Sequence, residues 1–205
     1  MSRAFIAIAV LLSPSAAFAG PIDAPPPPPP VVVAVDEPFE GPYVGLEFGH
    51  VFGDGELTQS VPGATTTTLD LDYDNGTAWG IFGGYNVQNG AMVYGGEARY
   101  LHLNEIGAGD DYEIPYVADL RARIGYAAGD VMFYGAAGVS FSEYESGVTS
   151  IDLTGYNLGL GAEYNVSENL FLRADFTARE LSGDSGGQDL DQTINTVTIG
   201  AGLRF

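Results

Sequence analysis

The sequence predicts an all-β fold, an eight-stranded antiparallel up-and-down transmembrane β-barrel. Three observations support this prediction. Apolar side chains alternate with polar residues or glycine in eight segments of strand length, which is the period of a strand with two different sides. Many apolar sides begin and end with aromatic residues, a pattern typical of the two aromatic girdles of a membrane barrel. The opposite sides are rich in glycine and carry charges of both signs.

Residues 1–19 have the pattern of a secretory signal peptide. Arg3 provides a charged start, Ala4 to Leu12 an apolar centre, and Ala17-Phe18-Ala19 a small-residue cleavage site. A membrane anchor is the alternative, but the apolar run is too short, because a helix needs about 20 residues to cross the hydrocarbon core. We therefore leave this segment out of the predicted fold.

Residues 20–40 are expected to form a Pro-rich periplasmic linker. The unbroken run Pro25 to Pro30 has fixed φ angles and no N–H donors, so it favours an extended polyproline II spacer. A docking site for a proline-binding domain is the alternative, and the flanking residues give it no support. The barrel domain is then expected to cover residues 41–205.

In the first four expected strands, apolar residues recur at every second position over most of the segment. The sides assigned to lipid are Val44, Leu46, Phe48 and Phe52; Trp79, Ile81, Tyr85 and Val87; Tyr94, Ala98 and Tyr100; and Tyr116, Ala118, Leu120, Ala122, Ile124 and Tyr126. The positions between them hold glycines and charged residues. This alternation predicts strands whose two sides face different surroundings.

The last four expected strands show the same period. Their lipid-facing sides are Phe133, Ala137, Val139 and Phe141; Tyr156, Leu158, Leu160, Ala162 and Tyr164; Leu170, Leu172, Ala174 and Phe176; and Val197, Ile199, Ala201, Leu203 and Phe205. A soluble β-sandwich could hide such sides in its core. Aromatic residues at both ends of many of them favour a membrane wall with two interfacial girdles instead.

The inward positions carry acids and arginines, and these are expected to pair inside the barrel. The expected lumen salt-bridge network consists of Glu47, Glu97, Arg99, Asp119, Arg121, Arg123, Glu163, Arg173, Asp175 and Arg204. Buried charges persist when they are paired, and a guanidinium group pairs well with a carboxylate. A lumen sealed by salt bridges is the favoured interpretation, and ion conduction and catalysis are the alternatives.

The connections between the expected strands alternate in length. Those at Asn89-Gly90, Ala128 to Asp130 and Asn165 to Asn169 are short, whereas those at 53–75, 104–113, 142–150 and 180–192 are longer and polar. This alternation places both termini and the tight turns on the periplasmic side and the longer loops outside.

The longer loops are strongly acidic, with Arg179 as a nearby cation in the fourth. Their acids are Asp54, Glu56, Asp70, Asp72, Asp74, Glu105, Asp110, Asp111, Glu113, Glu143, Glu145, Glu180, Asp184, Asp189 and Asp191. Like charges at this density repel, so mobile loops are expected. Solubilisation of the loop tips is the favoured interpretation, and binding of divalent cations is the alternative.

Composition and motifs exclude several functions. The 205-residue chain has 27 acidic residues, seven arginines, no lysine and a formal charge of −20, so nucleic acid is not an expected partner. Without cysteine there is no thiolate metal site and no thiol nucleophile. His50 and His102 have no nucleophile placed beside them by sequence, and Asp70, Asp72 and Asp74 lack the glycine and distal glutamate of a calcium loop. No catalytic residue, metal or cofactor is expected.

Four motifs within residues 41–205 carry a family resemblance. They are Gly41-Pro42-Tyr43-Val44-Gly45, Leu120-Arg121-Ala122-Arg123-Ile124-Gly125-Tyr126, Gly161-Ala162-Glu163-Tyr164 and Gly202-Leu203-Arg204-Phe205. This pattern resembles the small outer-membrane β-barrel proteins of Gram-negative bacteria, which include the OmpA membrane domain and the opacity-type surface proteins. The resemblance implies that Phe205 is the terminal aromatic signal for insertion by the barrel-assembly machinery.

The expected function is that of an integral outer-membrane protein with a structural or surface-contact role and no enzymatic activity. A barrel of eight strands is just wide enough for side chains to fill it, so a broad solute pore is not expected. A narrow ion channel is the second hypothesis, and a lipid-modifying barrel enzyme is the third. Outer-membrane lipids and lipopolysaccharide are the expected partners.

Overall fold

The computed structural model describes residues 37–59, 67–72, 75–104, 112–146, 149–185 and 188–205. The expected signal peptide and most of the expected linker, with its proline run, lie outside these residues. Within them every regular element is a β-strand, and they contain no helix that could cross a membrane.

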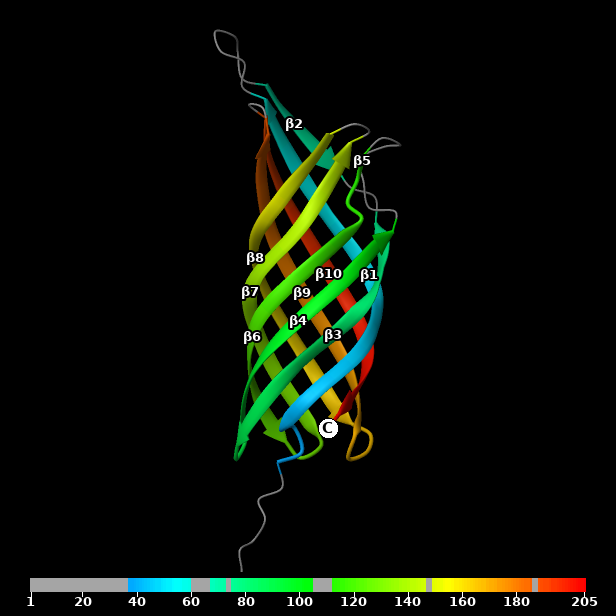
Figure 1. The fold of residues 1–205 in the computed structure, drawn as a ribbon, viewed down its shortest axis with the longest axis vertical. Coiled ribbons are helices and arrows are strands. Elements are labelled where there is room, and N and C mark those ends of the chain that lie inside the picture. Colours follow the sequence, from blue (N-terminus) through cyan, green and yellow to red (C-terminus); the bar gives the residue numbers. More distant parts are fainter. Residues whose placement is uncertain (1–36, 60–66, 73–74, 105–111, 147–148, 186–187) are drawn as a thin grey trace, which may run out of the picture. The chain divides into compact units, whose positions relative to one another are not determined.

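Eight long strands form the wall of a closed antiparallel barrel (Figure 1). They are β1 (Gly41–Gln59), β3 (Gly76–Asn89), β4 (Met92–Asn104), β6 (Tyr116–Ala128), β7 (Val131–Ser146), β8 (Thr149–Asn165), β9 (Leu170–Ser185) and β10 (Gln188–Arg204). Two short strands, β2 (Thr67–Asp72) and β5 (Tyr112–Glu113), pair with the far ends of β1 and β7. The expected eight-stranded up-and-down barrel is therefore confirmed.

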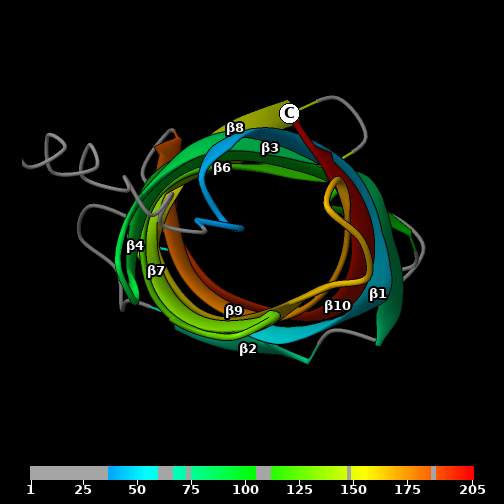
Figure 2. The ribbon, with the colours of Figure 1, turned by 90° about the horizontal axis from the view of Figure 1, so that it is seen from below.

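The barrel closes where the first and last strands meet. β1 pairs with β10 from Tyr43, opposite Arg204, to Gln59, opposite Gln188, and this pairing joins the two ends of the sheet. Figure 2 shows the strands as a ring with the blue β1 beside the red β10. Closure removes the free sheet edges that a membrane would leave without hydrogen-bond partners.

One end of the barrel, here called the turn end, carries the short connections. Gly90 and Gly129 adopt φ angles of 59° and 64° in the turns between β3 and β4 and between β6 and β7, a region that glycine enters without strain. The connection from Asn165 to Leu170 is closed by backbone hydrogen bonds from Val166 and Ser167 to Leu170. The three short turns predicted from the sequence are all present.

The opposite end, here called the hairpin end, differs from the prediction. Much of what was expected as loop is strand: β1 continues to Gln59, β7 and β8 reach Ser146 and Thr149, and β9 and β10 reach Ser185 and Gln188. Beyond the apolar band the outward side of these strands is polar, while apolar residues such as Leu153, Leu181 and Ile194 lie on the inward side, so the outward apolar alternation stops although the backbone ladder continues. The predicted loop boundaries were wrong for this reason.

Most of the acids assigned to loops therefore lie in strands. Asp54 and Glu56 are in β1, Asp70 and Asp72 in β2, Glu113 in β5, Glu143 and Glu145 in β7, Glu180 and Asp184 in β9, and Asp189 and Asp191 in β10. Asp74, Glu105, Asp110 and Asp111 lie outside the described residues. The expectation of extended mobile loops does not fit the paired strands that carry these eleven acids.

The segment before β1 belongs to the barrel. Glu37 to Glu40 form a turn, and Phe39 is fully buried against Val93, Met132 and Tyr134. Figure 2 shows the blue start of the described chain inside the ring of strands. The folded unit therefore begins before residue 41, because Phe39 fills the lumen at the turn end.

Candidate functional site

The interior of the barrel contains a closed ring of alternating acids and arginines. Going round it, the neighbouring pairs are Glu97–Arg121 (2.7 Å), Arg121–Asp175 (2.9 Å), Asp175–Arg99 (2.9 Å), Arg99–Glu47 (2.8 Å), Glu47–Arg173 (3.2 Å) and Arg173–Glu97 (2.7 Å). These six residues are called the ion-pair ring. They come from β1, β4, β6 and β9, so the ring ties opposite sides of the barrel wall together.

Further pairs extend the network toward both ends of the barrel. Glu97 also contacts Arg123, which bonds to Glu163 at 2.5 Å, and Glu163 in turn contacts Arg204 at 2.8 Å. Toward the hairpin end, Asp119 and Arg179 form a separate pair through two hydrogen bonds of 2.7 and 2.9 Å. All of these side chains are buried, and pairing offsets the cost of removing their charges from water.

Hydroxyl groups and aromatic rings complete the network. The Tyr43 and Tyr134 hydroxyls donate to Glu97 and Asp175 at 2.8 and 2.6 Å, and the Thr177 hydroxyl donates to Asp175 at 2.6 Å. The guanidinium of Arg123 lies 3.9 Å from the Tyr134 ring centre, and that of Arg173 lies 3.6 Å from the Phe82 ring centre. The arginines are therefore held by cation–π contacts as well as by carboxylates.

Apolar layers lie at both ends of this charged interior. At the hairpin end nine buried residues form one cluster: Val51, Ala78, Leu101, Leu103, Ile114, Val117, Leu153, Leu181 and Ile194. At the turn end Phe39 packs with Val93, Met132 and Tyr134, and Tyr43, Phe82 and Phe171 form a second aromatic group. Side chains of the described residues thus occupy the lumen at both ends and across its middle, as the diameter of an eight-stranded barrel allows.

The structure places all ten residues of the expected lumen network inside the barrel, each in at least one ion pair. Phe205 lies on the outer face at the turn end, with 73% of its surface exposed and its N–H bonded to the Pro42 carbonyl at 3.0 Å. His50 and His102 lie on the outer face, remote from the ring.

Sequence reasoning missed the sixth lumen arginine. Arg179 was expected only as a cation near the fourth loop, but it is fully buried in β9 and pairs with Asp119. The inward parity of Phe171, Arg173 and Asp175 continues through Thr177 to Arg179, and extending the strand by two residues would have found it. Tyr43 was missed similarly, because the expected strand began at Val44 and β1 begins at Gly41.

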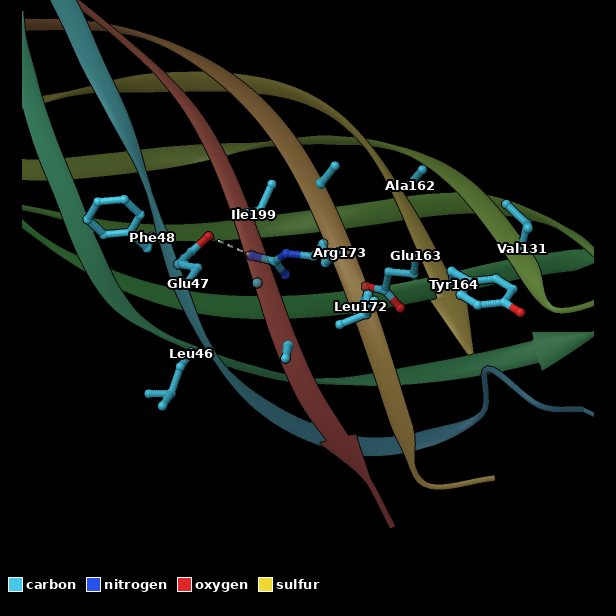
Figure 3. Close-up of a pocket in the computed structure, with 13 residues that line it drawn as sticks. Leu46, Glu47, Phe48, Val131, Ala162, Glu163, Tyr164, Leu172, Arg173 and Ile199 are labelled. Atoms are coloured by element: carbon cyan, nitrogen blue, oxygen red, sulfur yellow. Dashed lines mark hydrogen bonds and ion pairs between the residues drawn. The ribbon is translucent and has the colours of Figure 1, made fainter. Parts of the chain in front are cut away.

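The outer wall of the barrel is apolar between its two girdles. A shallow groove of about 730 Å³ crosses β8, β9, β10 and β1, where small residues such as Ala162, Ala174 and Ala201 lie among larger ones. Figure 3 shows Leu46, Phe48 and Ile199 around this groove and, through the wall, the ion pair between Glu47 and Arg173. Adjacent residues of one strand thus face lipid and lumen in turn.

The outer surface is almost without cations. The chain has no lysine, and all arginines among the described residues are in the lumen. On the outward faces of the described strands, only His50 and His102 can carry a positive charge. No group of three or more acidic or histidine side chains in this part of the chain could hold a metal ion.

Comparison with known families agrees with this architecture. Residues 5–205 match the family described as outer membrane protein beta-barrel domain. The chain belongs to this family. It is therefore an outer-membrane β-barrel protein. In barrels of this kind the short turns lie on the periplasmic side and the longer connections lie outside.

Relatives of this outer-membrane barrel include the 25 kDa outer-membrane immunogenic protein of Brucella canis. It is 28% identical over an aligned length of 218 residues, and the alignment covers 99% of this chain and 98% of the relative. The 22 kDa outer membrane protein of Rhizobium leguminosarum bv. viciae is also 28% identical, over 61% of this chain and 64% of that protein. Both names agree with the location that the fold and the family give.

A solved structure shares the fold. The Neisserial surface protein A, NspA, superposes with a TM-score of 0.56 at 15% identity, over 80% of this chain and 97% of that chain. At this identity the likeness concerns the fold alone.

Proposed function

We propose that this outer-membrane barrel acts through its outer surface, without enzymatic activity and without conducting solutes. The observation that carries the proposal is the filled lumen, in which the ion-pair ring lies between two apolar layers. Ions crossing such a barrel would have to displace buried, paired charges and then enter an apolar cluster. Separating a buried ion pair and moving an ion out of water into an apolar cluster each cost several kcal/mol.

The outer surface supports a contact role. Strands β1, β7, β8, β9 and β10 extend past the apolar band and carry exposed acids, among them Asp54, Glu56, Asp152, Glu180 and Asp191. Relatives of the chain are named as immunogenic proteins of the outer membrane, which supports exposure of this end at the cell surface. An enzyme would need a nucleophile and a base within hydrogen-bond reach of each other. On the outer wall, His50 stands opposite Thr77 and Val197, and His102 stands opposite Trp79 and Tyr116.

Planar-bilayer recording of the refolded full chain tests the proposal. Bilayers containing the protein should show the same current as protein-free bilayers at moderate voltage. A refolded porin of known conductance in the same lipid serves as the positive control. Reproducible conductance steps from the full chain would overturn the proposal and favour the narrow-channel hypothesis.

A further inference from the structure

A row of aromatic rings crosses the outer wall near the hairpin end. Phe48 of β1 stands opposite Trp79 of β3, Trp79 opposite His102 of β4, and His102 opposite Tyr116 of β6. The Trp79 and His102 rings meet edge to face at 5.4 Å. Strands in a sheet lie about 4.8 Å apart, so four neighbouring positions span about 14 Å. The row therefore offers a broad aromatic surface to whatever lies beside the wall.

A polar row lies directly beyond the aromatic one. His50 of β1 stands opposite Thr77 of β3, and Thr77 stands opposite Asn104 of β4. His50 is exposed, and Thr77 and Asn104 are half-buried. Together with Trp79 and His102, these three residues are called the imidazole patch. Imidazole, hydroxyl, amide and indole groups all donate hydrogen bonds, so the patch is rich in donors.

The charge of the surrounding surface makes the patch distinctive. His50 and His102 are the side chains that can become cationic on the outward faces of the described residues, because every described arginine is in the lumen. Asp54 lies on the same face of β1, four residues beyond His50, which is about 13 Å along a strand. An anionic group approaching the hairpin end would therefore be repelled by the acids and accepted at the patch.

The position of the patch indicates which anionic group it meets. Toward the turn end it borders the apolar wall at Leu46 and Ile81, which are 67% and 53% exposed. Toward the outside it borders the acidic ends of the strands. This is the headgroup level of the outer leaflet, where tryptophan and other amphipathic rings collect. In a Gram-negative outer membrane that leaflet is made of glycolipid whose sugars carry phosphate.

We propose that the imidazole patch binds a phosphorylated sugar headgroup of an outer-leaflet glycolipid. The phosphate accepts hydrogen bonds from the donors of His50, Thr77, Asn104 and His102, and a sugar ring lies with its C–H face against the aromatic row. The breadth of that row suits linked sugar rings better than the small headgroup of a phospholipid. The proposal does not depend on the closed lumen, so its failure would leave the proposed function untouched.

Trp79 is the single tryptophan of the chain and lies within the patch, so its fluorescence reports binding directly. The refolded full chain in detergent is titrated with diphosphorylated lipid A, with fully dephosphorylated lipid A, and with phosphatidylglycerol. We expect saturable binding of diphosphorylated lipid A, with a midpoint at least tenfold lower than for either of the other two lipids. Adduct counting by native mass spectrometry provides a second readout that does not depend on fluorescence.

The test variant is His50→Ala with His102→Ala, which alters exposed or half-buried positions and leaves the lumen intact. The matched control is Tyr94→Ala with Tyr126→Ala, which removes two exposed rings from the girdle at the turn end. The histidine variant should raise the midpoint for diphosphorylated lipid A at least tenfold, and the control should leave it unchanged. Equal midpoints for wild type and the histidine variant would overturn the proposal. Equal binding of dephosphorylated lipid A or of phosphatidylglycerol would also overturn it.

Discussion

Replacing Glu97 with glutamine should strongly destabilise the barrel. The Glu97 carboxylate accepts hydrogen bonds from Arg121 at 2.8 Å, Arg123 at 3.1 Å and Arg173 at 2.7 Å, and from the Tyr43 hydroxyl at 2.8 Å. Glu97→Gln keeps the size of the side chain and removes its charge. The lumen would then hold six guanidinium groups and four carboxylates in place of five.

The size of the effect follows from the lost pairs and from what remains. At an effective dielectric constant of about 20, one close ion pair contributes about 4 kcal/mol of attraction. Arg121, Arg123 and Arg173 each keep a second carboxylate partner, in Asp175, Glu163 and Glu47. Breaking a buried network by removing one partner costs about 3–5 kcal/mol. This is a large part of the ~5–15 kcal/mol by which a domain is usually stable.

Urea unfolding of the refolded protein in lipid vesicles measures this loss of unfolding free energy. Trp79 emission is the probe, because Trp79 is 54% exposed on the lipid side. Glu56→Gln is the matched control, since Glu56 is an exposed acid of the same type on β1. Its free energy of unfolding should change by less than about 0.5 kcal/mol. If Glu97→Gln and Glu56→Gln shift the unfolding free energy equally, the ion-pair ring does not stabilise the barrel as argued.

Four further variants probe other parts of the molecule. Asp119→Asn should lower the free energy of unfolding by about 3–5 kcal/mol, because Arg179 loses its carboxylate partner. The double variant Asp119→Leu with Arg179→Met removes both charges and should be far closer to wild type. Equal losses of unfolding free energy in urea for the two would contradict this. Phe39→Ala should lower the free energy of unfolding by about 3 kcal/mol without producing bilayer conductance, because the ion-pair ring and the apolar layer at the hairpin end remain. Deleting Phe205 should lower the yield of heat-modifiable protein in the outer-membrane fraction several-fold, and an unchanged yield would remove this residue as an assembly signal.

The sequence was sufficient to predict the barrel wall. A charged side chain toward lipid is costly, so the period of two along β6 assigns Arg121 and Arg123 to the lumen and Leu120 and Ala122 to lipid with little ambiguity. Ten of the residues that form the lumen network follow from this alternation. The alternation is local, and a single strand displays it by itself.

The pairing of those residues could not be predicted from alternation. Arg99 on β4 bonds to Glu47 on β1 and to Asp175 on β9, and these partners depend on barrel closure and on the stagger of its strands. Phe39 escaped prediction because it precedes the alternating pattern and enters the lumen from a turn. The hairpin ends escaped because the outward side of the strands becomes polar there, and apolar residues such as Ile194 of β10 lie on the inward side instead.

Solution NMR of the arginine side chains tests the central claim most directly, namely that every described arginine of the barrel is held in a closed lumen. In the full chain with Arg3→Lys, the remaining arginines are the six that the structure places there. With ¹⁵N-arginine labelling, we expect six separate Nε–H signals that exchange slowly with water. Those of Arg99, Arg121 and Arg179 should be shifted most, because their Nε–H groups donate to carboxylates at 2.8–2.9 Å. Signals that coincide with free arginine and exchange rapidly would show an open, hydrated lumen and contradict the account.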